Sequence, residues 1–298
     1  MDLIVQPQEG LVPILAAIAD AKKSIDITVF RLDRAAVIKA LAEAVQRGVA
    51  VRALIAHTNS SGDKALRKLE LKLLDEGVTV ARSDDDLVRY HGKMIIVDRG
   101  RLLLLGFNYT KLDIDKSRSL GLIVEDDAVV KEAIRLFEAD LLKQQYTPRH
   151  HALVVSPENA RERLASFIRG AREQLVIYDA RLSDRSMIRL IEERAKAGVD
   201  VRVLGRCAKA GARLKWDTLA HYRLHIRAIV KDGEHAFVGS QSLRKVELDE
   251  RREVGMLIAH RPTVRRILAT FDEDWALTAA AREAAQAAGK EAAASAQT

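Results

Sequence analysis

Apolar residues recur along the chain in two alternating patterns. One segment has apolar residues at helical spacing with a glycine just after them: Ile38, Leu41, Ala42, Val45 and Gly48. The alternating stretch "VAVRALI" at 49–55 then predicts a strand. Two later stretches, "KMIIVD" at 93–98 and "RLLLLG" at 101–106, are almost continuously apolar, which is typical of strands covered on both faces. The pattern predicts an α/β fold with sheets covered by helices.

The same order of patterns occurs twice. The stretch "SIDITVFRLDR" at 24–34 resembles "QLVIYDARLSD" at 174–184, with an offset of 150 positions. Further on the offset is 134 and the matched pairs keep one register: His91/His225, Asp98/Asp232, Arg118/Arg252, Phe137/Phe271 and Asp140/Asp274. The first half therefore holds 16 extra residues between about Ala56 and Tyr90. Chance similarity would not keep this register, so we interpret the chain as an internal duplication.

The duplication predicts two α/β lobes, at 1–147 and 152–276, which meet near Pro148. The Ala-rich tail at 277–298 has no apolar stripe and is expected to be loosely ordered.

Composition is that of an ordinary globular protein, with 48% hydrophobic and 31% charged residues among 298. No apolar stretch reaches the roughly 18 to 20 residues that a membrane span needs, and the N-terminus lacks the basic start of a secretory signal. Cys207 is the single cysteine, which suits a reducing compartment. We therefore expect a cytoplasmic protein, with peripheral contact to a membrane left open. We also expect a monomer, because one pair of lobes should suffice for a site. The net charge of +7 favours a polyanionic partner, either nucleic acid or an anionic membrane surface.

The candidate chemistry lies in two matched stretches, "RYHGKMIIVD" at 89–98 and "RLHIRAIVKD" at 223–232. Residues two apart on a strand share a face, so each histidine is expected beside a cation: His91 with Lys93, and His225 with Arg227. A fixed cation would repel a metal ion but suits a phosphate, which it neutralises while one histidine attacks and the other protonates the leaving alcohol.

The aspartates of the two stretches have a different expected role. Asp98 and Asp232 lie seven positions past their histidines, an odd number, so on a regular strand they face away from the imidazole. We expect them to be structural carboxylates.

The pattern H-x-K-x4-D, present twice in one chain, resembles the phospholipase D superfamily. The resemblance covers residues 1 to 276 and implies two α/β/α lobes related by a pseudo-twofold axis, with the active site at their interface. It also implies a covalent phosphohistidine and no metal or other cofactor. Carried over, the site residues are His91, Lys93, His225, Arg227 and Glu253, with Asn108, Ser240 and Ser242 on the phosphate-binding turns.

The resemblance favours His91 as the nucleophile and His225, oriented by Glu253, as the general acid and then the base for water. The sequence departs from the family pattern at several positions. Arg227 replaces the family lysine, Ser242 stands where asparagine is usual, and Ser119 occupies the first-half position that matches Glu253. Both histidines are present, so an active enzyme is expected.

Members with two motifs in one chain are mostly lipid enzymes, which favours a phospholipid phosphodiesterase or phosphatidyltransferase of the phospholipase D or cardiolipin synthase type. A nuclease of the same mechanism and an inactive phosphate-binding protein are the alternatives. The basic amphipathic stretch "KALRKLELKLL" at 64–74 could place Leu66, Leu69 and Leu73 on an anionic membrane, or could be a plain surface helix.

Overall fold

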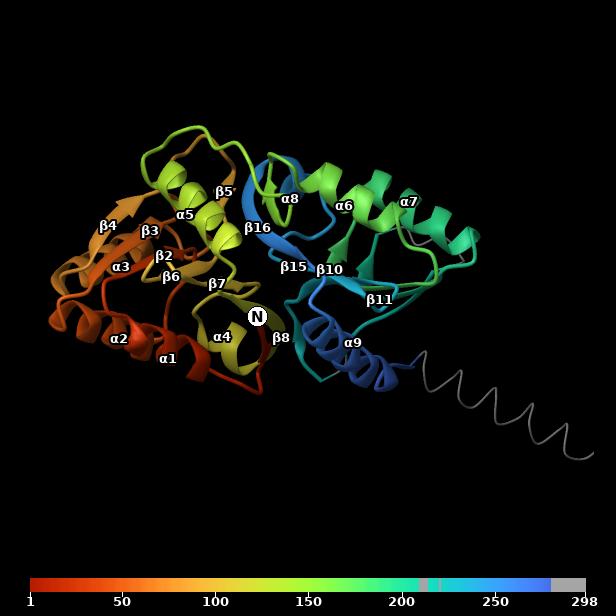
Figure 1. Ribbon diagram of the computed structural model, residues 1–298, viewed down its shortest axis with the longest axis horizontal. Helices are drawn as coiled ribbons and strands as arrows, with labels where there is room; N and C mark the ends of the chain where they lie inside the picture. The colour runs from red at the N-terminus through yellow and green to blue at the C-terminus, as the bar shows by residue number, and fades with distance from the viewer. Residues whose placement is uncertain (209–213, 220, 280–298) are drawn as a thin grey trace, which may run out of the picture.

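The computed structural model describes residues 1–208, 214–219 and 221–279 as two α/β lobes that lie side by side (Figure 1). The α/β prediction is confirmed. Most of the predicted tail, from residue 280 onward, lies outside the described residues.

The first lobe begins with a strand that leads into alternating helices and strands. Its elements are β1 (Asp2–Gln6), α1 (Val12–Asp20), β2 (Ser24–Val29), α2 (Ala35–Gln46), β3 (Ala50–Ile55), α3 (Asp63–Asp75), β4 (Thr79–Arg82), β5 (Arg89–Tyr90), β6 (Met94–Val97), β7 (Arg101–Leu105), α4 (Lys111–Asp115), β8 (Ser117–Val124) and α5 (Asp127–Leu141).

The second lobe repeats this order, and the only element of the first lobe without a counterpart among the described residues is α3. Its elements are β9 (Leu153–Ser156), α6 (Ala160–Arg169), β10 (Gln174–Leu182), α7 (Arg185–Lys196), β11 (Asp200–Cys207), β12 (Lys215–Asp217), β13 (Arg223–Leu224), β14 (Arg227–Lys231), β15 (His235–Gly239), α8 (Lys245–Asp249), β16 (Arg251–Ile258) and α9 (Arg261–Ala276).

The two sheets have the same strand order. The first runs β1-β8-β7-β6-β2-β3-β4, and the second contains the matching series β16-β15-β14-β10-β11-β12 with β9 beside β16. The registers also agree, because Val29 pairs with Ile55 where β2 meets β3, and Asp179 pairs with Gly205 where β10 meets β11. The structure therefore supports the duplication and its 150-residue offset.

Alternation along the strands places the two faces of each sheet in different cores. In β6, Ile95 packs with the helices on the outer face, whereas Ile96 faces the core that both lobes share. Helices α1, α2 and α3 cover the outer face of the first sheet, and α6 and α7 cover that of the second. The shared core contains Phe137 of α5 and Phe271 of α9, so one continuous apolar layer joins the lobes.

Each lobe also gives a short strand to the sheet of the other. Strand β5 pairs in parallel with β16, and β13 pairs in parallel with β8. Both short strands lie immediately before a motif histidine, His91 or His225. The boundary between the lobes is therefore crossed twice, at the two places where the candidate chemistry begins.

Two buried ion pairs cross the same boundary. Arg118 on β8 makes two hydrogen bonds to Asp274 of α9, of 2.8 and 2.9 Å, and Arg252 on β16 donates to Asp140 of α5 at 3.0 Å. The 134-residue offset relates Arg118 to Arg252 and Asp140 to Asp274. Because each arginine is paired with a carboxylate of the other lobe, the interface repeats the duplication.

The insertion in the first half is helix α3 with its flanking turns. Leu66 and Leu73 are buried in the outer core, and Leu69 packs against it. Of the two interpretations that the sequence left open, the structure supports the plain surface helix, because the apolar face of this amphipathic helix covers the core of the lobe. Leu71 and Leu74 are the exposed leucines of this helix.

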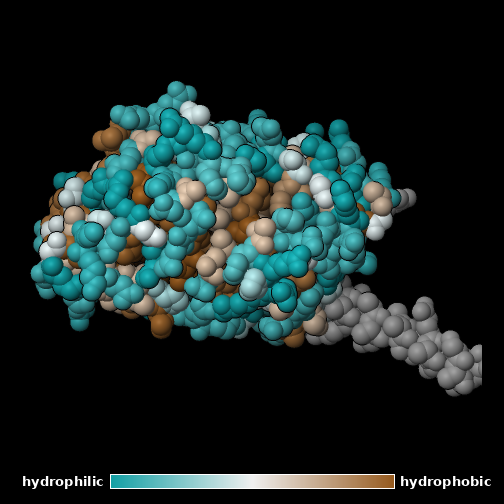
Figure 2. Space-filling model, in the orientation of Figure 1, coloured by the Kyte–Doolittle hydropathy of each residue, from teal (hydrophilic) through white to brown (hydrophobic). Residues whose placement is uncertain are grey.

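The described helices include none that combines the length and the apolar composition required to cross a lipid bilayer. The face of the molecule drawn in Figure 2 is mostly hydrophilic.

Candidate active site

The exchanged strands place each motif histidine against the opposite lobe. The backbone N–H of His91 donates to the carbonyl of Arg252 at 2.7 Å, and that of His225 donates to the carbonyl of Arg118 at 3.1 Å. The next residue on each receiving strand, Glu253 or Ser119, therefore lies beside the histidine of the other half. This pairing across the lobes determines which carboxylate lies beside which imidazole.

Glu253 contacts His91. Its Oε2 lies 2.8 Å from His91 Nδ1, and both side chains are buried. A carboxylate at Nδ1 favours the tautomer with its proton on that nitrogen, so the lone pair of the ring lies on Nε2. Phe30 packs edge-on against the imidazole with the ring centroids 4.4 Å apart. His91 is thus held in one orientation.

His225 has a different partner from the one that we predicted. Its Nδ1 lies 3.7 Å from Oδ2 of Asp113, beyond hydrogen-bond distance, and its backbone carbonyl accepts a bond from Ser119 Oγ at 3.4 Å. The prediction that Glu253 orients His225 is wrong, because pairing across the lobes places Glu253 at His91. Asp113 is the residue whose carboxylate lies within ion-pair distance of the His225 imidazole.

The two motif cations differ in their surroundings. Lys93 is buried, and its Nζ lies 2.9 Å from each ring nitrogen of His91. Arg227 is half-buried; it donates through Nε to Ser242 Oγ at 3.2 Å and through Nη1 to the carbonyl of His225. Each cation therefore stands beside its own histidine, although the histidines lie in the short connections that follow β5 and β13 and not on a strand.

Both histidines are predominantly neutral near pH 7. Burial, with Lys93 and Arg227 close by, holds the pKa of His91 well below its usual value. The pKa of His225 is also held low, by burial and then by Arg227, and Lys93 contributes to the same shift. Lys93 and Arg227 therefore both lower the pKa of each motif histidine.

Burial also changes the pKa of the charged groups around the histidines. It lowers the pKa of Lys93 to about 7 and raises that of Glu253 above its usual range. Burial opposes the ionisation of Asp113, but the neighbouring His225 and two hydrogen bonds from Asn108 outweigh it and lower its pKa to about 2. An arriving phosphate would favour the protonated forms of Lys93 and the histidines, because its charge is opposite to theirs.

The predicted phosphate-binding turns lie next to these groups, each tied to a short helix. Asn108 donates through its backbone N and Nδ2 to Asp113 on α4, and Ser242 donates through its backbone N to Glu247 on α8. Asn108 Oδ1 is buried without a hydrogen-bond partner in the described structure. Ser240 is fully buried and bonds Val254 of β16, which does not place it on a cavity wall.

The motif aspartates have structural positions. Asp98 accepts hydrogen bonds from the backbone N–H groups of residues 22, 23 and 24, and Asp232 accepts from those of residues 172, 173 and 174. Both have a positive φ, 51° and 54°, at the turn that follows the motif strand. Each carboxylate therefore anchors this turn to the start of the neighbouring strand.

A cleft of about 630 Å³ opens beside His225 in the second lobe. We call it the basic cleft, because five arginines and one histidine lie on its walls: Arg181, Arg206, Arg223, Arg227, Arg244 and His225. Glu247 is the one carboxylate among the described lining residues. Such a surface suits an anionic ligand.

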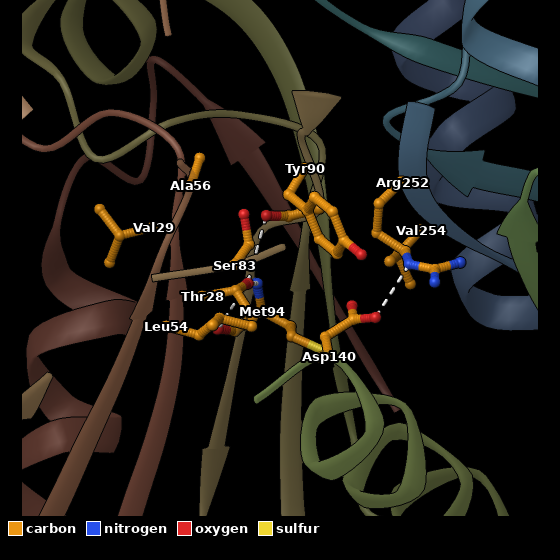
Figure 3. Close-up of a pocket in the computed structure, with 11 residues that line it drawn as sticks. Thr28, Val29, Leu54, Ala56, Ser83, Tyr90, Met94, Asp140, Arg252 and Val254 are labelled. Carbon is orange, nitrogen blue, oxygen red and sulfur yellow. Dashed lines mark hydrogen bonds and ion pairs between the residues drawn. The ribbon is translucent and has the colours of Figure 1, made fainter. Parts of the chain in front are cut away.

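A second cavity lies between the lobes and is much smaller, at about 20 Å³ (Figure 3). Tyr90 and Met94 of the first lobe and Val254 of the second line it, and the ion pair of Asp140 with Arg252 closes one side. This volume suffices for about one water molecule. The cavity is too small to be the substrate site.

Several functional candidates were missed by the reasoning from sequence. Asp113 and Glu247 occupy matched positions 134 residues apart, so the duplication itself contained the signal that would have found them. Arg181 and Arg206 belong to no motif. Among the described residues, no group of three or more His, Cys, Asp or Glu side chains is arranged to hold a metal ion.

Comparison with known proteins identifies relatives of both halves. The family model described as "Cardiolipin synthase, PLD-like domain" matches residues 14–141 and 164–275. The mouse protein named mitochondrial cardiolipin hydrolase is 28% identical over 149 residues, which cover 48% of this chain and 66% of that protein. Its human counterpart is 30% identical over 143 residues, covering 47% and 54%. The chain thus matches between about half and two thirds of the length of these relatives.

Solved structures share the two-lobe fold. A polyphosphate kinase from Porphyromonas gingivalis superposes on 90% of this chain with a TM-score of 0.73 and 22% identity, using 49% of its own length. A phosphatidylserine synthase from Haemophilus influenzae Rd KW20 superposes on 92% of this chain with a TM-score of 0.70 and 13% identity, over 84% of its length. At these identities the likeness shows the fold.

Proposed function

Because the chain belongs to the phospholipase D superfamily, in the family of cardiolipin synthase and phospholipase D-like domains, we propose that it is a phosphodiesterase acting on phospholipids. The observation that carries the proposal is the pair of buried histidines, each beside its own cation and each placed against the other lobe. The curated relatives named as cardiolipin hydrolases favour a lipid substrate.

In the first step His91 Nε2 attacks the phosphorus of the diester. The contact of Nδ1 with Glu253 Oε2 supports this assignment, because the developing positive charge on the imidazole is stabilised by the carboxylate. The bond from phosphorus to the leaving oxygen breaks, and His225, protonated when the substrate binds, gives its proton to that oxygen. The product is an alcohol and a phosphoryl group joined covalently to His91.

In the second step water, or a second alcohol, attacks the phosphohistidine. His225, now neutral, takes the proton of the attacking oxygen as the phosphorus–nitrogen bond breaks, which restores both histidines. Lys93 and Arg227 neutralise the non-bridging oxygens in both steps. Attack by water gives hydrolysis, and attack by a lipid alcohol gives phosphatidyl transfer.

The test is turnover in the presence of EDTA, measured for the wild type, His91→Ala and His225→Ala on mixed phosphatidylglycerol/phosphatidylethanolamine vesicles. We expect chelator-resistant turnover in the wild type that both substitutions abolish. Cleavage of single-stranded DNA with intact lipids would replace the proposal by a nuclease. Loss of activity in EDTA that returns with a divalent ion would contradict the metal-independent mechanism.

A further inference from the structure

The duplication allows the basic cleft to be compared with the same place in the first lobe. Phe30 packs against His91 there, whereas the matching residue of the second lobe is Ala180, on the cleft wall. Ile55 is fully buried, whereas its counterpart is Gly205. At Gly205 a Cβ atom would lie 1.6 Å from the carbonyl oxygen of Asp179, so a side chain is excluded. Small residues at matched positions thus make room beside His225 that is absent beside His91.

Two of the cleft arginines are particular to the second lobe, whereas Arg181 matches Arg31 of the first lobe. Ala56 and Thr110 of the first lobe correspond to Arg206 and Arg244 of the second. The first-lobe counterpart of the cleft, where Arg31 and Thr110 lie, is a hollow of about 70 Å³ that is also lined by Leu66 and Leu69. The second lobe therefore has both a larger space and additional arginines.

Two of the arginines are available to a ligand. Two cleft arginines already form ion pairs: Arg223 with Asp113 at 2.7 Å, and Arg244 with Glu247 at 3.1 Å. Arg227 is assigned to the reacting phosphate. Arg181 and Arg206 are exposed on the cleft wall, and within the described structure their guanidinium groups make no hydrogen bond or ion pair. A guanidinium group binds a phosphate through two parallel hydrogen bonds, so these two arginines form a prepared anion site.

We propose that Arg181 and Arg206 bind a second phosphate of the substrate, on the alcohol that leaves when the first phosphate reacts. This rests on the proposed function and deepens it. The basic cleft contains His225, the proton donor to the leaving oxygen, so the leaving alcohol lies in this cleft. A headgroup amine would be repelled by the arginines, whereas a second phosphate on a short polyol linker is attracted. The substrate class is thus a phospholipid with two phosphates.

The experiment compares Arg181→Gln/Arg206→Gln with Arg169→Gln/Arg189→Gln, a control that removes the same charge from exposed arginines of α6 and α7. The substrates are cardiolipin, with two phosphates joined by glycerol, and phosphatidylglycerol, with one, each in neutral detergent micelles. We expect the wild type and the control to favour cardiolipin by about tenfold or more in kcat/KM. The cleft variant should lose this preference, mainly through a higher KM for cardiolipin.

Binding of the water-soluble headgroup makes the outcome independent of lipid turnover. Titration calorimetry with glycerol 1,3-bisphosphate and glycerol 3-phosphate should show tighter binding of the bisphosphate by the wild type and the control, and equal binding of both by the cleft variant. Equal affinities in the wild type, or a cleft variant that keeps the preference, would overturn the inference. Tighter binding of the bisphosphate without turnover of any lipid would support the second-phosphate site and contradict the proposed function.

Discussion

His91 Nδ1 and Glu253 Oε2 lie 2.8 Å apart, although they belong to different lobes and are separated by 162 positions in the chain. The contact exists because β5, just before His91, joins the sheet of the second lobe beside β16. The strand pairing that joins the lobes therefore also positions the proposed nucleophile.

Replacing Glu253 by Gln should slow the reaction without altering the shape of the site. The amide keeps the size of the carboxylate but stabilises the positive imidazole less, so we expect kcat to fall by about 10- to 100-fold with little change in KM. Ser119→Ala, at the matched position of the first half, is the control and should stay within about threefold. Steady-state measurement of kcat and KM for the wild type and both variants tests this expectation. Equal effects of the two substitutions would contradict the special role of Glu253.

A substrate with a good leaving group distinguishes the two histidines. A nitrophenyl ester needs no general acid in the first step, so His225→Ala should still form the covalent adduct and then release it slowly. His91→Ala should form no adduct. Rapid quenching with a radiolabelled phosphodiester, followed by peptide mapping of the alkali-stable label, measures this. A label on His225 in the His91→Ala protein would reverse the assignment.

The affinity for an anion should fall as the pH rises through about 7. Burial lowers the pKa of Lys93 to about 7, so its side chain is a cation below this pH and becomes neutral above it. Sulfate keeps the same charge over this range and can be titrated by calorimetry from pH 6 to 9. We expect up to about a tenfold loss of affinity per pH unit above 7. Lys93→Arg should flatten the profile, because arginine stays charged. An unchanged slope in this variant would assign the titration to another group.

Breaking the ion pair between Arg118 and Asp274 should destabilise the whole chain. Both side chains are buried, and Asp274→Asn leaves the arginine charge without its partner, so we expect a loss of about 3–5 kcal/mol in the free energy of unfolding. Lys131→Gln removes one member of an exposed pair with Asp127 and should cost less than about 0.5 kcal/mol. Urea denaturation gives both values. A separate early transition of one lobe would contradict unfolding as one unit.

Helix α3 should respond to mutation as part of the core. Leu73→Ala should lower the free energy of unfolding by about 2–5 kcal/mol, because Leu73 is fully buried. Leu71→Ser and Leu74→Ser, on the exposed side, should leave stability within about 0.5 kcal/mol. Thermal denaturation and vesicle sedimentation of the three variants test this. If Leu73→Ala left stability unchanged and reduced vesicle binding, the core assignment of α3 would be wrong.

Much of the fold follows from periodicity and from the repeat. The helix around Leu41, its end at Gly48 and the hairpin of β6 and β7 occur where the patterns predict them, since each depends on local spacing and on burial. The contact of Lys93 with His91 was expected from a spacing of two on a strand, but the structure places both residues in the connection between β5 and β6. Asp98 has the structural position that we expected, but it lies at a positive-φ turn after β6 and not on the continuous strand that the prediction assumed.

The partner of Glu253 could not be predicted by comparing the halves separately. Its spacing from His225 placed it with that histidine, but the contact depends on the exchange of β5 and β13 between the sheets. Nothing in the composition of two-residue strands signals which sheet they join. The role of helix α3 stayed open for another reason. A basic helix with one apolar stripe has the same sequence pattern whether the stripe covers a core or contacts a membrane. Only the tertiary contacts of Leu66 and Leu73 distinguish the two.

The exchanged strands have a consequence for chain topology. A cut in the connector at 142–152 would leave each fragment without the short strand and the buried counter-charge that the other supplies. Either fragment alone would expose an open sheet edge and an uncompensated arginine, and would be prone to aggregate. Expressed together, the fragments should complement each other and restore activity, so the covalent link between the halves is dispensable for assembly.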